Sequence, residues 1–145
     1  MNLKDTGARF VTGLHRAVFD ATSGRLLGRM AGMPVLALTT RGRKTGKPRT
    51  TMLTSPVQDG DSIVLVASYG GDDRHPRWFT NLEADPQVEI VMKGRRSRMR
   101  ARVASPAERE RLWPQVTGTY GGYAAYQRRT DRNIPLVILE PEDNA

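Results

Sequence analysis

The stretch that decides the fold is residues 59–68, which reads Asp59-Gly60-Asp61-Ser62-Ile63-Val64-Leu65-Val66-Ala67-Ser68. An Asp-Gly pair is typical of a tight hairpin turn. The run after it is almost entirely apolar, as expected for a strand that is buried on both faces. Residues 49–58 form the preceding strand of the same hairpin. The stretch therefore predicts a sheet built from hairpins, with the strand of residues 62–68 at its centre.

The same patterns extend outward to the rest of the chain. Apolar runs predict further strands over residues 34–40, 87–93, 97–104 and 134–139, and helices over residues 76–84, 105–117 and 120–131. The capping box Ser105-Pro106-Ala107-Glu108 starts the second of these helices. Strands that follow one another through turns predict a mostly antiparallel sheet. Six strands with helices at the joins predict an α+β fold, a small and partly open β-barrel with peripheral helices.

The N-terminal residues 1–32 are expected to form a helical arm apart from a domain of residues 33–145. Residues 8–21 place apolar side chains on one side of a helix, while Arg9 and Arg16 lie off that stripe. Such an amphipathic arm either packs on the core of the domain or lies on a membrane surface. The sequence leaves both alternatives open.

Composition limits the kind of protein. A chain of 145 residues is long enough for one domain with a real core. It has 23 basic and 15 acidic side chains, a net charge of +8, which favours an anionic partner. The absence of cysteine excludes disulfides and thiolate chemistry, and two distant histidines predict no metal site. There is no apolar run of membrane-spanning length and no secretory signal, so a cytoplasmic location is expected.

A cationic turn follows the strand of residues 34–40. It reads Thr39-Thr40-Arg41-Gly42-Arg43-Lys44-Thr45-Gly46-Lys47-Pro48-Arg49. Its glycines allow the backbone to approach a ligand closely, and successive N–H groups in such a turn can form an anion-binding nest. Arginine adds a planar fork that matches phosphate or carboxylate. The turn therefore predicts a site for an anionic ligand.

A second cluster lies where the central strand ends. Ser68 is followed by Gly70 and Gly71, just before the predicted helix of residues 76–84. Small residues and free N–H groups at such a place can hold the edge of a flat polar ring. Trp78 is expected to belong to the core.

Three tyrosines form a third cluster. Tyr120, Tyr123 and Tyr126 are spaced by three, so on one helix they would lie on one face. A core stripe is the alternative, but three phenols together favour the lining of a pocket for a planar ligand.

Standard catalytic motifs are missing from the sequence: it has no G-x-S-x-G, Walker or Rossmann pattern. If the chain is an enzyme, a bound cofactor must carry the reactive atom. Four alternating arginines, from Arg96 to Arg102, fall on one face of a predicted strand. They are typical of a solvated strand that resists edge pairing. A nucleic-acid site is the least favoured alternative, because no aromatic residues are interleaved for base stacking.

In their order along the chain, these segments resemble the deazaflavin (F420)-dependent nitroreductase family of actinobacteria. The resemblance is carried by Leu38-Thr39-Thr40-x-Gly42-Arg43-Lys44-Thr45-Gly46-x-Pro48-Arg49, Ala67-Ser68-x-Gly70-Gly71, Pro76-x-Trp78, Asn81-Leu82, Trp113-Pro114, the three tyrosines and Thr130-Asp131-Arg132-x-Ile134-Pro135. It implies a split β-barrel similar to that of FMN-binding proteins. It also implies coenzyme F420, an 8-hydroxy-5-deazaflavin with a phospholactyl-oligoglutamate tail, and hydride transfer to a quinone, nitroaromatic or conjugated enone.

The resemblance also implies roles for individual residues. The cofactor tail would be held by Arg43, Lys44, Thr45, Gly46 and Arg49. The remaining cofactor contacts would come from Ala67, Ser68, Tyr69, Gly70 and Asn81. Catalytic roles on the substrate side fall to Ser68, Tyr120, Tyr123 and Tyr126. The chain departs from the family at Tyr69, where relatives often have a basic residue, and in the strand after Arg49, which lacks the aromatic residue of some relatives.

Three alternatives remain at this stage. An FMN-dependent split-barrel oxidoreductase would leave much of the cationic turn unoccupied, because FMN has a short tail. A non-catalytic F420 carrier would need the same turn, and a nucleic-acid-binding module is the least favoured. A lipid-soluble quinone acceptor would suit peripheral binding of residues 1–32 to an anionic membrane. The sequence does not specify an oligomeric state.

Overall fold

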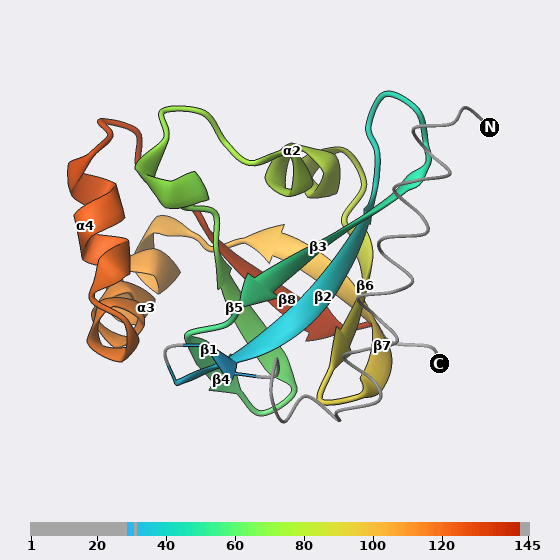
Figure 1. Ribbon diagram of the computed structural model, residues 1–145, viewed down its shortest axis with the longest axis horizontal. Helices are drawn as coiled ribbons and strands as arrows, with labels where there is room; N and C mark the ends of the chain where they lie inside the picture. The colour runs from blue at the N-terminus through green and yellow to red at the C-terminus, as the bar shows by residue number, and fades with distance from the viewer. Residues whose placement is uncertain (1–28, 31, 143–145) are drawn as a thin grey trace.

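The computed structural model describes residues 29–30 and 32–142, and in them eight strands form one curled sheet (Figure 1). The strands are β1 (Arg29–Met30), β2 (Met33–Arg41), β3 (Pro48–Thr54), β4 (Val57–Asp59), β5 (Ser62–Val66), β6 (Gln87–Met92), β7 (Arg95–Val103) and β8 (Leu136–Pro141). All seven strand pairings among them are antiparallel. The predicted antiparallel sheet is therefore confirmed, but the prediction of six strands was wrong. The short β1 was not foreseen, and the predicted strand of residues 49–58 divides into β3 and β4.

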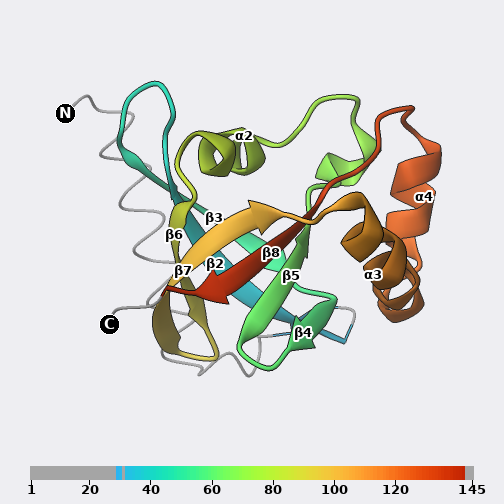
Figure 2. The ribbon, with the colours of Figure 1, turned by 180° about the vertical axis from the view of Figure 1, so that it is seen from behind.

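The sheet is curled (Figure 2), and the corner between β3 and β4 connects two of its outer strands. The strand order is β1-β2-β6-β7-β8-β5-β4, and β3 pairs with β2. Ser55, between β3 and β4, is fully buried. Its N–H donates to the carbonyl of Pro34 at 3.0 Å, and its hydroxyl donates to the carbonyl of Val64 at 2.7 Å. These bonds tie the start of β2 to β5, which explains why the predicted long strand breaks here.

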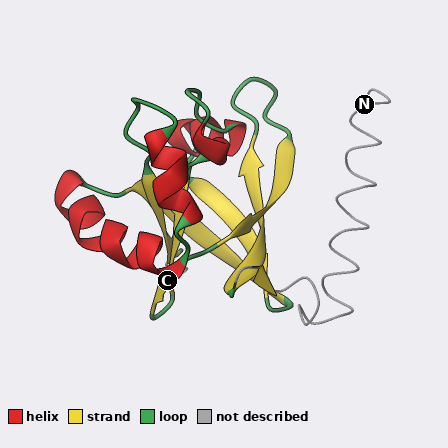
Figure 3. Ribbon diagram, turned by 60° about the vertical axis from the view of Figure 1, so that its left-hand side comes forward, coloured by secondary structure: helices red, strands yellow, loops and turns green. Residues whose placement is uncertain are grey.

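Four helical segments accompany the sheet: η1 (Tyr69–Gly71), α2 (Arg77–Ala84), α3 (Pro106–Thr119) and α4 (Gly122–Arg128). Helix α3 begins at the predicted capping box, where the Glu108 N–H donates to the Ser105 hydroxyl and the Ser105 N–H donates to the Glu108 carboxylate. Figure 3 shows the helices gathered toward one side of the molecule and the strands toward the other. Helix α2 lies beside β2 and β7, while α3 and α4 lie together.

Two apolar clusters hold these layers together. One fills the curled sheet and includes Leu36, Leu65 and Leu139 from strands and Phe79 and Leu82 from α2. The other packs α3 and α4 on the opposite face of β5 and β8; it includes Val64, Val66, Leu112, Val116, Tyr123, Leu136 and Ile138. Since alternate side chains of β5 enter different clusters, the prediction that this strand is buried on both faces is confirmed. Its predicted place at the centre of the sheet was wrong, because β5 lies next to the end strand β4.

The arginines of β7 are exposed as predicted, but they do not lie at an edge of the sheet. Arg96, Arg98, Arg100 and Arg102 are exposed on one face, as predicted. However, β7 pairs with β6 and with β8, so the idea that they protect a sheet edge was wrong. Arg102 bridges the carboxylates of Glu108 and Glu140, at 2.7 and 2.8 Å. This arginine therefore joins the sheet to the start of α3.

The predicted arm of residues 1–32 lies almost entirely outside the described residues. The described Arg29 and Met30 pair with β2, so the sheet begins within the range that was assigned to the arm. The helix expected over residues 8–21 cannot be compared with the structure for the same reason. Of the helices that the structure describes, none is long and apolar enough to cross a membrane.

Candidate functional site

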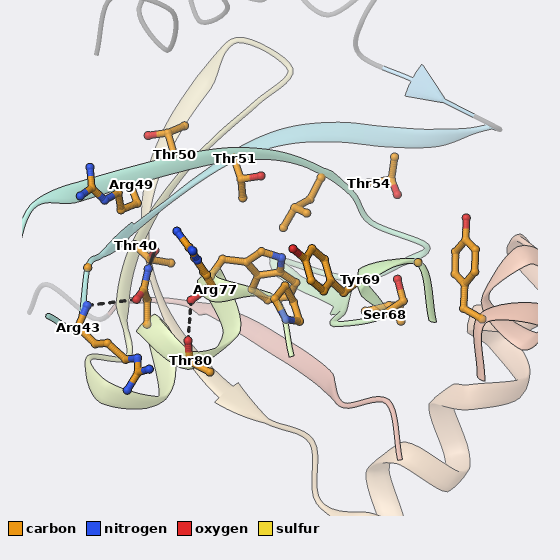
Figure 4. A pocket seen from close by; sticks show the side chains of 18 of the residues that line it. Thr40, Arg43, Arg49, Thr50, Thr51, Thr54, Ser68, Tyr69, Arg77 and Thr80 are labelled. Carbon is orange, nitrogen blue, oxygen red and sulfur yellow. Dashed lines mark hydrogen bonds between the residues drawn. The ribbon is translucent and has the colours of Figure 1, made fainter. Parts of the chain in front are cut away.

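One cleft of about 980 Å³ collects most of the side chains that the sequence singled out (Figure 4). Its walls come from β2, β3 and the loop between them on one side and from η1, α2 and the tyrosine segment on the other. Eleven of the thirteen predicted site residues line it: Arg43, Lys44, Thr45, Arg49, Ser68, Tyr69, Gly70, Asn81, Tyr120, Tyr123 and Tyr126. The two others lie outside: Gly46 borders a shallower groove, and Ala67 is fully buried.

The loop of residues 42–47, the cationic loop, is closed by its own backbone. The Gly42 N–H donates to the Lys47 carbonyl at 2.8 Å, and the Gly46 N–H donates to the Gly42 carbonyl at 2.7 Å. A Cβ at Gly42 would lie 3.0 Å from the Thr45 hydroxyl oxygen, so glycine allows this tight closure. Within the described chain, the N–H groups of Lys44 and Thr45 have no hydrogen-bond partner. The predicted anion nest is thus reduced to these two amides.

Asn81 attaches the cationic loop to α2. Its side-chain oxygen accepts a hydrogen bond from the Arg43 N–H at 3.1 Å, and its side-chain nitrogen donates to the Thr40 hydroxyl at 3.2 Å. Only 7% of Asn81 is exposed, so both bonds are shielded from water. A buried amide therefore fixes the backbone at Arg43, while the Arg43 and Lys44 side chains make no ion pair among the described residues.

The loop after β5 contains three consecutive residues with positive φ, Tyr69 at 47°, Gly70 at 64° and Gly71 at 86°. Ser68 is nearly buried, whereas Tyr69 is 52% exposed and lines the cleft. Arg132 fixes this loop from beyond α4: its guanidinium donates to the carbonyls of Ala67 at 3.1 Å, Ser68 at 2.9 Å and Asp72 at 2.8 Å. No individual role was predicted for Arg132, because its bonds reach 60 residues or more along the chain.

The three tyrosines form a ladder of edge-to-face rings, with centroids 5.2 Å apart for Tyr120 and Tyr123 and 6.2 Å apart for Tyr123 and Tyr126. They do not share one helix: Tyr120 directly follows α3, and the other two lie on α4. Tyr123 is 5% exposed and belongs to a core cluster as well as to the cleft. Its hydroxyl lies 3.0 Å from the Thr54 hydroxyl and donates to the Met33 sulfur at 3.7 Å.

Two phenols of the ladder, those of Tyr123 and Tyr126, have a raised pKa. Burial raises the pKa of Tyr123. Hydrogen bonding with Tyr120, followed by burial, raises the pKa of Tyr126. A neutral phenol can donate a hydrogen bond to an oxygen atom of a ligand at this end of the cleft.

Several lining residues were missed at the level of the sequence. Four threonines of β2 and β3 face the cleft, Thr40, Thr50, Thr51 and Thr54, and α2 adds Arg77, Trp78 and Thr80. Trp78 packs against the barrel core, as expected, but it also lines the cleft. The threonine-rich strand after Arg49 was a usable signal, since three hydroxyl side chains in five residues give the strand polar surface to expose. In the described part of the chain, no group of three or more His, Cys, Asp or Glu residues is placed to bind a metal.

The model of the family described as F420H(2)-dependent quinone reductase matches residues 12–141. The chain belongs to this family. A curated F420H(2)-dependent quinone reductase of Mycobacterium tuberculosis is 44% identical over 130 residues, which cover 87% of each chain. The chain is therefore an oxidoreductase enzyme, and its cofactor is coenzyme F420, as the sequence resemblance implied.

Solved structures agree with this F420-dependent reductase assignment. An F420-H2-dependent reductase, FDR-A, has a TM-score of 0.67 and 38% identity, covering 74% of this chain and 94% of its own. A structure described as a domain-swapped dimer has a TM-score of 0.68 and 31% identity, covering 92% of this chain and 99% of its own. The likeness to FDR-A confirms the split-barrel class of the fold.

Proposed function

We propose that this F420-dependent reductase transfers hydride to a planar quinone at the tyrosine end of the cleft, while the cationic loop holds the tail of the cofactor. One observation carries the proposal: a single cleft contains the cationic loop, the Ser68–Gly70 turn and the tyrosine ladder. An extended cofactor with an anionic tail and a flat reactive ring needs these features in one continuous site.

The cationic end fits a phosphorylated, carboxylate-rich tail. Arg43 and Lys44 offer charges without an ion-pair partner among the described residues, and the amides of Lys44 and Thr45 offer two further donors. Such donors match phosphate and carboxylate oxygens. FMN, with a shorter tail, would leave part of this end unfilled, so the cleft favours the deazaflavin over FMN.

When bound, reduced F420 supplies a hydride. The chain itself must position the acceptor and provide hydrogen-bond donors for the oxygen that becomes a hydroxyl. The phenols of Tyr120 and Tyr126 and the hydroxyl of Ser68 are the donors that we assign to this task. Tyr123 is the buried member of the ladder, and we assign it to holding the rings in place through Thr54 and Met33.

Nitroaromatics and conjugated enones share the features that this site would recognise, a flat electrophile with an oxygen at its edge. We therefore propose them as further acceptors beside quinones. Measuring the turnover of F420H2 with menadione, a nitroaromatic and a cyclic enone would rank the three classes. Binding of F420 without turnover of any of them would refute all three acceptor classes.

Cofactor binding is tested first by titrating the protein with F420, FMN and duplex DNA. We expect micromolar or tighter binding of F420 alone. The double variant Arg43→Ala/Lys44→Ala should lose most of this affinity and keep its fold, because exposed substitutions cost little stability. A matched control, Arg95→Ala/Arg100→Ala, removes two exposed charges from β7 and should bind F420 normally. Binding of FMN or DNA in place of F420 would refute the proposal.

We also propose that residues 1–32 bring the enzyme to an anionic membrane, where lipid-soluble quinones reside. Flotation of the full chain with anionic and neutral liposomes measures this directly. Arg9→Glu/Arg16→Glu should abolish flotation with anionic vesicles. Equal recovery of the protein with both kinds of vesicle, or with the variant, would count against a membrane role.

A further inference from the structure

Arg77 is a cation that faces the cleft from the wall opposite the cationic loop. It is the first residue of α2, is exposed, and lines the cleft. In Figure 4 its side chain points from α2 toward β3, at the end of the cleft where Arg43 and Arg49 lie. Cationic residues of two separate elements, the cationic loop and α2, therefore line the same cleft.

Nothing in the described protein neutralises this charge. The Arg77 carbonyl accepts a hydrogen bond from the Thr80 hydroxyl at 3.0 Å, but its guanidinium has no hydrogen bond or ion pair among the described residues. Asp85, the acid that follows α2, pairs instead with Arg41 at 3.6 Å. The described residues that line the cleft include Arg43, Lys44, Arg49 and Arg77 and not one Asp or Glu. The described lining of the cleft therefore offers no carboxylate to Arg43, Lys44 or Arg77.

Helix stability does not account for an arginine at this position. The first turn of a helix carries a partial positive charge, so acidic side chains stabilise it and basic ones oppose it. The first turn of α2 has no acidic residue and begins with Arg77. An exposed, unpaired cation at the unfavourable end of a helix, aimed into a cationic cleft, is best explained by an anionic ligand that lies between the two walls.

We propose that Arg77 binds an oxyanion of the cofactor tail, phosphate or carboxylate, from the side opposite the cationic loop, so that the tail lies between two cationic walls. This rests on the proposed function, in which the tail occupies the cationic end. Arg77 then selects ligands by the charge of the tail, and it makes no contribution to the binding of the deazaflavin ring.

The test compares three ligands on the full-length protein: F420 with its oligoglutamate, the phospholactyl form without glutamates, and the tail-less 8-hydroxy-5-deazariboflavin. Dissociation constants come from the change in fluorescence on titration. Arg77→Gln should weaken binding of F420 by about tenfold, the loss of one charge-assisted contact. It should also reduce the dependence of affinity on salt. Binding of the tail-less ligand should stay within about twofold of wild type, since its tail charges are missing.

Two further variants keep the test decisive. Arg95→Gln removes one exposed charge from β7 and should bind all three ligands as the wild type does. Arg77→Lys keeps the charge without the planar fork, so its affinity for F420 should fall between those of wild type and Arg77→Gln. If Arg77→Gln does not fold, Arg77→Lys takes its place in the comparison. If Arg77→Gln binds the phospholactyl form more weakly than wild type does, Arg77 contacts the phosphate. If it loses affinity only for F420 with its oligoglutamate, Arg77 contacts a carboxylate.

The outcomes separate this inference from the proposed function. If wild type binds F420 and Arg77→Gln binds it equally well, Arg77 has no role in tail binding and the inference is wrong. An equal loss for the tail-less ligand would also overturn it, because Arg77 would then act on the ring or on the fold. If wild type does not bind F420, the proposed function fails, whatever the variants do.

Discussion

Gly71 allows η1 to pack directly against α4, and its replacement by alanine gives a stringent test of the site's architecture. The φ of Gly71 is +86°, and a Cβ there would lie 2.7 Å from the Tyr126 carbonyl oxygen and 3.0 Å from side-chain carbons of Arg129. A positive φ costs a non-glycine residue about 1–2 kcal/mol. Overpacking against a backbone carbonyl, which cannot rotate away, adds about 1–3 kcal/mol. Gly71→Ala should therefore destabilise the protein by about 2–5 kcal/mol.

Two other glycines allow the cost of the positive φ and the cost of overpacking to be measured separately. Gly70 also has a positive φ, +64°, but nothing lies within 4 Å of a Cβ there, so Gly70→Ala should cost only the first contribution, about 1–2 kcal/mol. Gly118, inside α3, has open space around it, and Gly118→Ala should stabilise by up to about 1 kcal/mol through helix propensity. Equilibrium urea unfolding, followed by circular dichroism, measures all three. If Gly71→Ala is no less stable than Gly70→Ala, the close packing of η1 on α4 is refuted.

Three further predictions concern single side chains. Asn81→Leu should cost about 2–3 kcal/mol in thermal unfolding and weaken F420 binding, because the Arg43 N–H loses its acceptor and the cationic loop its anchor. Tyr123→Phe should cost about 1 kcal/mol, through its hydrogen bonds alone, while turnover with menadione changes by less than about threefold; a large fall in kcat would make its hydroxyl catalytic. Hydrogen bonds from Arg102 lower the pKa of Glu108 from 4.5 to about 2, so this carboxylate stabilises the folded state above pH 4.5 and loses that effect as the pH falls toward 2. Glu108→Gln should therefore be less stable than wild type at pH 7, with a difference that shrinks in acid; a constant difference in melting temperature from pH 7 to 3 would contradict this.

The features that the sequence predicted well are local ones. The cationic turn, the capping box at Ser105 and the buried strand after Asp59-Gly60 each depend on residue types at short spacing, and each is found at its predicted place. The tyrosine cluster was predicted to line a pocket, and it does, although it spans two helices instead of one.

The features that the sequence missed depend on tertiary neighbours. Ser55 breaks the long predicted strand because its bonds reach Pro34 and Val64, which no local pattern reveals. The role of the β7 arginines in protecting a sheet edge was misjudged, because only the sheet order shows that β7 is an interior strand. No role was predicted for Arg77, and it lines the cleft only because α2 faces β3 across it.

The bonds of Arg132 have a consequence for redesign of the enzyme. Arg132 follows α4 and holds the carbonyls of Ala67, Ser68 and Asp72, so the tyrosine ladder and the turn beneath it are fastened to each other. The cationic loop belongs to another part of the chain and is fastened to α2 through Asn81. If the proposed roles hold, a chimera that exchanges residues 105–135 for those of a relative should change the choice of electron acceptor and leave cofactor binding native, provided that it keeps Arg132.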